Sequence, residues 1–482
     1  MDHQLEENPN IVLIVMDTAR ADFVDNSLPA EVTPNIANVA EEGTVFSNSF
    51  SSAPWTLPSH ASIFTGAYSS KHGAHAGHKR LENDLIRLPE VFEEAGYTTV
   101  GMSNNQWISE DFGFDTGFNE FYKGWQRFQT QSNIGGLQAG ESSHGKWNRI
   151  ARQMLSGNTL LNLANGLHSK LISNSDNGAK RTTLEFKNQL SNGYIETPFF
   201  CFINFLEPHL DYQPPKSYAK EFLPADVSFD NAMDVPQRPW EFVTNQLSMS
   251  DKEFDILESL YKAELNYLDK KIGEIVKKLK REGEWDNTIF TIIGDHGENI
   301  GDHGLMDHQY CLYDTLIHVP TIVSGGSFDN GETIDPLVQL VDIAPTLVEE
   351  AGIEAPKFDS QCQGIPMQSN SEREYIISEY MAPQPSVDAI ESRVGDPNNV
   401  MKKYNRSLRS IRTKDYKVIR GSDGTIESIN LGNRGSGVPS EIEEELIEKL
   451  DHWVQSSTNN SYDGSVDVSR KTKKRLEDMG YI

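Results

Sequence analysis

The stretch NIVLIVMD, residues 10–17, is an apolar run rich in β-branched side chains that ends at an aspartate. An apolar run without polar alternation is typical of a strand that is buried on both faces of a parallel sheet. Open α/β sheets bind their ligands beyond the carboxyl ends of the strands. The stretch therefore predicts a buried strand and places Asp17 where functional side chains gather.

Helix and strand signals alternate after this strand. Thr33 and Pro34 predict the start of a helix that ends at Gly43, and a strand is expected near residues 45–50. A second helix is predicted at residues 88–95, followed by a strand at residues 98–102. This β-α-β alternation indicates the α/β class.

Two later apolar runs repeat the opening pattern. PFFCFINFL, residues 198–206, leads into Glu207-Pro208-His209, and TIFTIIG, residues 288–294, leads into Asp295-His296-Gly297. Apolar positions at helical spacing from residue 251 to about residue 280 predict a long helix between them. The ends of three predicted strands thus converge on one site.

Length and composition predict one large domain with an appendage. The chain has 482 residues and 37% hydrophobic content, enough for a large core. Residues 130–180 are rich in Ser, Asn and Gly, and residues 125–190 are interpreted as an insertion or lid within a catalytic domain at residues 1–385. Residues 386–482 are predicted to form a small α+β C-terminal subdomain, with short strands within residues 408–420 and a helix at residues 439–455.

The chain is strongly acidic. It has 43 Lys and Arg against 71 Asp and Glu, a net charge of −28, which argues against nucleic acid as a partner. Such a surface favours a halophilic cytoplasm, and an acidic mesophilic protein is the alternative. The N-terminus MDHQLEENPN resembles no secretory leader, and no apolar run is long enough to cross a membrane, so we expect a cytoplasmic protein without a transmembrane segment. The oligomeric state leaves no trace in the sequence.

The segment APWTLPSHASIFTG, residues 53–66, predicts a short helix with Thr56 at its start. A helix N-terminus offers backbone N–H groups and the positive end of a dipole to an anion. That position suits a nucleophile beside a phosphate or sulfate group. An ordinary helix cap is the alternative interpretation.

Asp17, Asp295 and His296 are candidate metal ligands. Carboxylates with an imidazole suit zinc or manganese, or a harder cation when more oxygens join. Taken singly, a strand-terminal aspartate is often only a turn former.

Several histidines lie close in sequence to these segments. His209, His303 and His308 flank the candidate metal loops, and His72 follows the Thr56 helix. A histidine can protonate a departing oxygen near neutral pH, and we expect at least one of them to do so. For each alone, a structural hydrogen bond is the alternative.

These motifs together resemble the sulfatase branch of the alkaline phosphatase superfamily, in the order that the family shows. The matching stretches are VMDTARADF (residues 15–23), the segment from Thr33 to Gly73, FLEPHLDYQPP (205–215), GDHGENIGDHGLMDHQYCLYDTLIHVP (294–320), RSLRSIRTKDYKVIR (406–420) and KRLEDMGYI (474–482). The resemblance implies an alkaline-phosphatase-like, mostly parallel central sheet flanked by helices.

The resemblance also implies a set of site residues. One divalent ion, calcium, magnesium, manganese or zinc, would be held by Asp17, Thr56, Asp295 and His296. Thr56 occupies the position of the nucleophile. His209 and His308 correspond to residues that handle the substrate oxygens.

The chain departs from the family pattern at several positions. Well-known sulfatases have an oxidisable Cys or Ser, within C/S-x-P-x-R, where this chain has Thr56, so no formylglycine is expected. His60 stands where the family arginine supports the nucleophile. Asn105 ends Ser103-Asn104-Asn105, which replaces a Gly-Lys-Trp-His type motif, and Thr18 replaces a second acidic residue. We predict a catalytic role for His60 and substrate contacts for Asn105 and His72.

The predicted activity is metal-dependent cleavage of a sulfate or phosphate ester by a metal-bound Thr56. The expected partner is a sulfated or phosphorylated small molecule or glycan. Because threonine is the nucleophile in phosphate-processing relatives, a phosphodiesterase or phosphotransferase on a sulfatase fold is one alternative. A non-catalytic, glycan-binding relative is the other.

Overall fold

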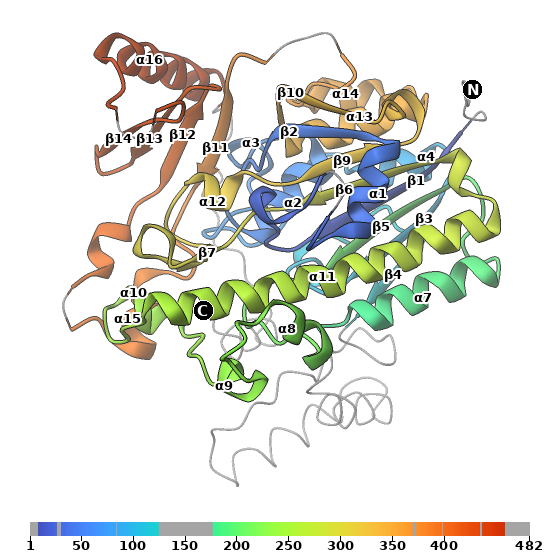
Figure 1. The fold of residues 1–482 in the computed structure, drawn as a ribbon. Coiled ribbons are helices and arrows are strands. Elements are labelled where there is room, and N and C mark those ends of the chain that lie inside the picture. Colours follow the sequence, from blue (N-terminus) through green and yellow to red (C-terminus); the bar gives the residue numbers. More distant parts are fainter. Residues whose placement is uncertain are drawn as a thin grey trace, which may run out of the picture.

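The computed structural model describes residues 8–26, 30–82, 84–124, 177–369, 373–397, 399–433 and 436–457. An eight-stranded sheet in the order β10-β2-β9-β6-β1-β5-β3-β4 forms the centre of the molecule (Figure 1). Its strands are β1 (Asn10–Met16), β2 (Thr44–Phe50), β3 (Thr98–Ser103), β4 (Glu120–Lys123), β5 (Phe199–Phe205), β6 (Thr288–Gly294), β9 (Thr321–Ser324) and β10 (Glu332–Gln339). Only β9 pairs antiparallel to its neighbours in this sheet.

Strand β1 lies in the interior of the sheet, parallel to both β5 and β6. Its side chains alternate between two cores, because successive residues of a strand point to opposite faces. Ile11, Leu13 and Val15 belong to one core, and Val12 and Ile14 belong to the other. This double burial explains the unbroken apolar run and confirms the predicted α/β class with a mostly parallel sheet.

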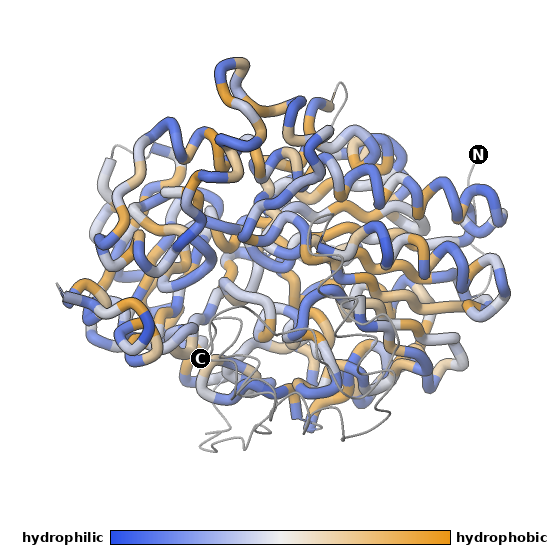
Figure 2. Tube along the Cα trace, turned by 90° about the horizontal axis from the view of Figure 1, so that it is seen from below, coloured by the Kyte–Doolittle hydropathy of each residue, from blue (hydrophilic) through white to orange (hydrophobic). Residues whose placement is uncertain are grey.

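Helices cover both faces of the sheet. One core includes residues of α2, α4 and α13, and the other includes residues of α1, α7 and α11. In Figure 2 much of the trace through the interior is orange, and the coiled stretches change repeatedly between orange and blue, as expected for helices with one apolar face. The helices are α1 (Pro34–Glu42), α2 (Thr56–Thr65), α3 (Ser69–His72), α4 (Leu88–Glu94), α7 (Ala179–Ser191), α8 (Lys216–Phe222), α9 (Phe229–Met233), α10 (Pro239–Val243), α11 (Asp251–Glu282), α12 (Asp314–Ile317), α13 (Ile343–Glu350), α14 (Pro356–Gln361), α15 (Val387–Val394) and α16 (Ser440–Ser457).

The long helix predicted from residue 251 is α11, and both of its ends carry a local signal. The hydroxyl of Ser250 accepts from the backbone N–H of Glu253, whose side chain accepts in return from the N–H of Ser250. Gly283 ends the helix in the left-handed conformation. The helix runs along one face of the sheet beside α7 and α8 (Figure 1).

A second, antiparallel sheet in the order β11-β12-β13-β14 forms the small C-terminal part, which confirms the predicted α+β subdomain. Its strands are β11 (Ile376–Tyr380), β12 (Leu408–Arg412), β13 (Tyr416–Gly421) and β14 (Ile426–Asn430). Helix α16 packs on this sheet through Leu446 and Leu450. The sheet begins at β11, ahead of residue 386, and the division of the chain at residue 385 stays a prediction.

Two predicted features lie largely outside the described residues. Of the stretch interpreted as a lid, residues 125–176 are not described, and its end forms most of α7. The terminal motif at residues 474–482 is likewise outside them. Among the helices that the structure describes, none has both the length and the apolar character needed to span a bilayer.

Candidate active site

The parallel register of the central strands brings the predicted site residues to one edge of the sheet. Met16 at the end of β1 pairs with Gly294 at the end of β6, so Asp17 and Asp295 leave the sheet side by side. Ser103 at the end of β3 lies opposite Asn204 of β5. Asn105, which follows Ser103, therefore reaches the same edge.

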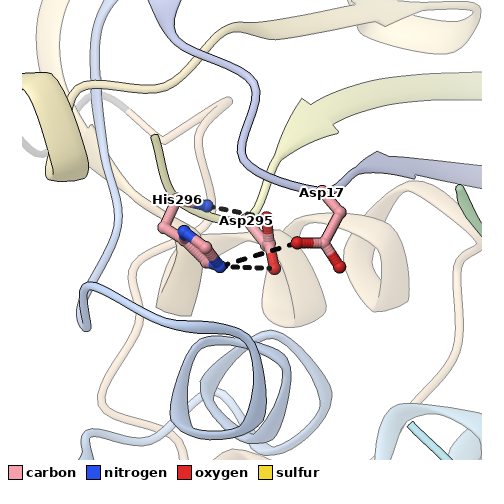
Figure 3. A group of neighbouring side chains, drawn as sticks. All are labelled: Asp17, Asp295 and His296. Atoms are coloured by element: carbon pink, nitrogen blue, oxygen red, sulfur yellow. Dashed lines mark hydrogen bonds and ion pairs between the residues drawn. The ribbon is translucent and has the colours of Figure 1, made fainter. Parts of the chain in front are cut away.

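Asp17, Asp295 and His296 form a compact buried cluster. Nε2 of His296 lies 3.7 Å from Oδ1 of Asp17 and 3.4 Å from Oδ2 of Asp295. The ligand atoms of the three residues all lie within 4.8 Å of one another. Figure 3 shows both carboxylates and the imidazole pointing toward a common centre.

In each of the two aspartates of this cluster, one carboxylate oxygen accepts hydrogen bonds from the protein. Oδ2 of Asp17 accepts from Nδ2 of Asn105 at 2.6 Å, and Oδ1 of Asp295 accepts from the backbone N–H groups of Thr18 and His296 at 3.1 and 2.8 Å. Oδ1 of Asp17 and Oδ2 of Asp295 are buried and have no hydrogen-bond partner among the described residues. Two unpartnered carboxylate oxygens therefore face the centre of the cluster.

The pKa values of the three residues indicate which ligand this centre suits. Burial raises the pKa of Asp17, and burial together with the Asp17 charge raises the pKa of Asp295 well above its usual range. Burial and the neighbouring His308 lower the pKa of His296, so this imidazole is neutral near neutral pH. A divalent cation would satisfy both orphaned oxygens and keep the carboxylates ionised, and oxygen and imidazole donors fit such an ion.

Thr56 is the first residue of α2 and contacts this cluster. Its Oγ1 lies 3.3 Å from Nε2 of His296 and 3.4 Å from Nδ2 of Asn105. The side chain is 2% exposed. Asn105 thus contacts both Thr56 and Asp17, and the positive end of the α2 dipole lies at the hydroxyl.

The first turn of α2 is tied to the strand end that carries Asp295. Oγ of Ser59 donates to the backbone oxygen of Asp295 at 2.7 Å. Nδ1 of His60 lies 3.0 Å from the backbone oxygen of Thr56 and 3.4 Å from Oδ2 of Asp295. Burial lowers the pKa of His60 to about 4, so it is a neutral group where the family arginine would be charged. Its position supports the backbone of Thr56.

His308 lies next to the cluster and has two acidic neighbours that the sequence interpretation missed. Its Nδ1 is 2.5 Å from Oδ1 of Asp307 and 3.3 Å from Oε1 of Glu298. Burial opposes its charged form, yet these carboxylates raise the pKa of His308 well above its usual range. Glu298 follows His296 and Asp307 precedes His308 in the sequence, and this spacing was the available signal. The ring of His308 lies 4.7 Å from that of His296.

The two other predicted histidines differ in position. The ring of His209, which follows β5, lies 5.0 Å from that of His308, so His209 belongs to the same region. His72 is buried beside α2, where its Nε2 lies 3.2 Å from Oγ of Ser62 and its Nδ1 accepts from the N–H of Ala74. Burial lowers the pKa of His72 to about 3. These are the contacts of a packing residue, and its predicted role in substrate binding stays a prediction.

Comparison with known proteins agrees with this geometry. The family model described as sulfatase matches residues 9–353. The chain belongs to the sulfatase family. Among curated relatives, the arylsulfatase of Clostridium perfringens is 26% identical over 388 residues, 72% of this chain and 76% of its own. The choline-sulfatase of Rhizobium meliloti is 23% identical over 406 residues, 78% of this chain and 74% of its own.

Solved sulfatase structures share the fold. A 2-O GAG sulfatase superposes with a TM-score of 0.66 at 18% identity and covers 94% of this chain and 93% of its own. The phosphonate monoester hydrolase of Silicibacter pomeroyi gives a TM-score of 0.65 at 18% identity, with 95% and 97% covered. As a member of the sulfatase family, the chain is a hydrolase of ester bonds with acidic and histidine groups that are compatible with a divalent metal.

Proposed function

We propose that this sulfatase hydrolyses a sulfate or phosphate ester, carried by a small molecule or glycan, with the hydroxyl of Thr56 as the nucleophile. The observation that carries the proposal is the position of Thr56 Oγ1 at the start of α2, 3.3 Å from Nε2 of His296. Beside it lie the two carboxylate oxygens that have no partner among the described residues. A hydroxyl that serves only as a helix cap needs no such neighbours.

The donor set defines what would be held and where. Asp17, Thr56, Asp295 and His296 would hold a divalent ion, which supplies Lewis-acid stabilisation of negative charge and lowers the pKa of a bound hydroxyl. The dipole of α2 places positive potential where the ester oxygens gather charge. Asn105 orients Asp17 through the 2.6 Å hydrogen bond and lies 3.4 Å from the nucleophile.

The departing oxygen requires a proton donor, and we assign this role to His308, whose pKa Asp307 and Glu298 raise. Asp307 and Glu298 hold its positive charge within the site. His209, 5.0 Å away between ring centroids, lies on the same side and would contact the leaving group. Water then hydrolyses the threonyl ester, and transfer to an acceptor alcohol would make the protein a phosphotransferase.

The second candidate function is that of a phosphodiesterase or phosphotransferase, which threonine at the nucleophile position favours. Its side chain offers a secondary alcohol and no route to the formylglycine aldehyde, so the ester preference depends on the alkoxide alone. Aryl sulfate, aryl phosphate and aryl phosphodiester esters, each tested with calcium, magnesium, manganese or zinc at low and high salt, separate these activities. Added glycerol reveals a phosphotransferase by the formation of glycerol phosphate.

The decisive variant is Thr56→Ala, which removes the hydroxyl and leaves the rest of α2 in place. We expect turnover to fall by about 10³-fold or more, because the residual activity must come from a different nucleophile. Thr65→Ala is the matched control, since Thr65 is a buried threonine of the same helix whose hydroxyl donates to the backbone oxygen of Ala61. Full activity in Thr56→Ala would refute the proposal, and binding without turnover in the wild-type protein would favour the glycan-binding alternative.

A further inference from the structure

A cavity of about 320 Å³ opens beside the histidine pair. Its volume lies within the range of small-molecule sites, roughly 300–1,000 Å³. His209 and Asp307 form one part of its wall, so the cavity adjoins the position at which a leaving group would depart. The remaining wall comes from the loop after β5, from the start of α10 and from the end of α15.

Most of the Asp, Glu, Lys and Arg side chains that line this cavity are acidic. Asp211, Glu241 and Asp307 contribute carboxylates. Arg238, the one lysine or arginine among the described lining residues, already forms an ion pair with Glu241, with Nη1 2.7 Å from Oε2. Asp307 is paired with His308. Asp211 adds a third carboxylate, whose pKa is raised by burial and by the charges of Asp307 and Glu298 and lowered by His209, so carboxylates outnumber the arginine in this wall.

The wall also offers an aromatic surface. Trp240 is half-buried in α10, and the guanidinium of Arg393 lies 5.0 Å from the centre of its ring. This cation–π contact fixes the indole against the end of α15. An aromatic face packs well on the apolar C–H surface of a sugar ring, and carboxylates accept hydrogen bonds from ring hydroxyls.

Resting on the proposed function, we propose that this cavity binds the leaving group as an uncharged, hydroxyl-bearing ring, and that Asp211 and Glu241 exclude leaving groups that carry a second anionic group. Trp240 supplies the stacking surface. The substrate class is therefore a sulfate or phosphate monoester of a neutral sugar. A second sulfate on that ring would meet the carboxylates of Asp211 and Glu241 at close range, and Arg238, the one lysine or arginine among the described lining residues, is already paired with Glu241.

One protein of the same fold binds a sugar that carries a second anionic group. A solved neighbour with a TM-score of 0.65 holds its substrate D-glucosamine-2-N,6-O-disulfate, which carries two sulfate groups. An added anion close to the carboxylates of Asp211 and Glu241 is disfavoured by roughly tenfold or more. We therefore expect this chain to discriminate strongly between singly and doubly charged esters.

A matched pair of aryl esters tests the charge selection without knowledge of the natural sugar. The 4-nitrophenyl ester, sulfate or phosphate, is compared with its analogue that carries one carboxylate on the ring. We expect kcat/KM to favour the neutral leaving group by about tenfold or more. Glu241→Gln should reduce this preference by about tenfold, because it removes a like charge and leaves the Arg238 guanidinium free to pair with the carboxylate.

The readout is the ratio between the two esters, which a general loss of activity does not alter. Asp226→Asn is the control, because Asp226 is an exposed aspartate paired with Lys252 outside the cavity, and it should leave the ratio unchanged. Equal kcat/KM values for the two esters in the wild-type protein would overturn the inference. A ratio that Glu241→Gln and Asp211→Asn both leave unchanged would overturn it as well.

Calorimetric titration of the same esters into the Thr56→Ala variant separates binding from turnover. Tighter binding of the neutral ester supports the cavity assignment even when no turnover is measured, and equal affinities contradict it. Failure of the proposed function has a different signature, which is turnover that survives in Thr56→Ala. Trp240→Ala should weaken binding of the neutral ester, and Trp240→Phe should restore most of it.

Discussion

Two buried groups of charged residues in this protein differ in how their carboxylates are satisfied. At the strand ends, Asp17 and Asp295 each keep one buried oxygen without a hydrogen-bond partner among the described residues. Between the central domain and the C-terminal sheet, both oxygens of Asp314 meet cationic groups, Nζ of Lys417 at 2.8 Å and Nη2 of Arg412 at 3.5 Å. Among the described residues, no lysine or arginine contacts the first group, and the second contains two such side chains.

The pKa values follow this difference. Burial raises the pKa of Asp17 and Asp295, whereas the charges of Lys417 and Arg412 overcome burial and lower the pKa of Asp314. A group that is satisfied within the chain stabilises the contact between two parts of the fold. A group at the edge of a parallel sheet whose buried carboxylate oxygens have no hydrogen-bond partner among the described residues is compatible with a divalent metal.

The largest expected effect comes from changing the strand-end group of Asp17 and Asp295. Asp295→Asn removes one of the two carboxylates that face the orphaned centre, and turnover should fall by about 10³-fold, since a metal ion supplies several kcal/mol of charge stabilisation. A divalent metal that raises the thermal midpoint of the wild-type protein should raise that of the variant far less, because binding to the native state stabilises it. A chelator should reproduce the loss in the wild-type protein. Full activity in Asp295→Asn would show that the centre holds no catalytic ion.

Changes in the second group, Asp314 with Lys417 and Arg412, should lower the free energy of unfolding. Lys417 is fully buried, and Lys417→Met would leave Asp314 facing Arg412 alone at 3.5 Å. Breaking a buried pair costs about 3–5 kcal/mol of unfolding free energy. The double variant Lys417→Met with Asp314→Leu should recover part of this loss, because it also removes the buried carboxylate that Lys417 neutralised. Arg412 loses that carboxylate but keeps its hydrogen bond to the backbone oxygen of Thr413 and its contact with the ring of Phe50.

Urea unfolding measures both variants. Lys414→Met is the control, since Lys414 pairs with Asp335 on the surface, where the two side chains are 50% and 79% exposed. It should leave the unfolding midpoint unchanged. A Lys417→Met protein as stable as the control would remove the distinction between the two groups.

The sequence predicted the strand-end group better than the group around Asp314, and the reason is local. NIVLIVM and TIFTIIG are apolar runs that end at Asp17 and Asp295, so strand and site residue are adjacent in the chain. The parallel register then brings the two aspartates together without further information. The predicted strand at residues 288–294 has the bounds of β6, and the predicted helix from residue 251 is α11.

Contacts that depend on distant segments were not predictable in this way. Asp314 and Lys417 meet only after the C-terminal sheet packs on the central domain. Both lie in stretches that match the family, but nothing along the chain indicates that they pair. β11 was missed as a strand of that sheet because its pairing with β12 spans residues 381–407. The charge of His308 depends on Glu298 and Asp307, whose side chains the loop brings together in space. Patterns along the chain reveal strand ends, and side-chain pairing across loops requires the fold.

The smallest expected effect is a pH dependence whose sign differs between the two groups. For Asp314 the folded pKa lies below the unfolded value near 3.9, so its contribution to stability is present above about pH 4 and is lost as the pH falls through the folded pKa. For Asp17 and Asp295 without a metal, the folded pKa lies above the unfolded value, so their contribution is present below about pH 4 and is lost as the pH rises through the folded pKa. The free energy of unfolding is measured against pH in the presence of a chelator. With rising pH it should fall less steeply in Asp17→Asn than in the wild-type protein, and it should rise less steeply in Asp314→Asn than in the wild-type protein. Added divalent metal should remove the first difference and leave the second, because the proposed ion binds the strand-end carboxylates and not Asp314. Parallel pH profiles in all three proteins would contradict the comparison.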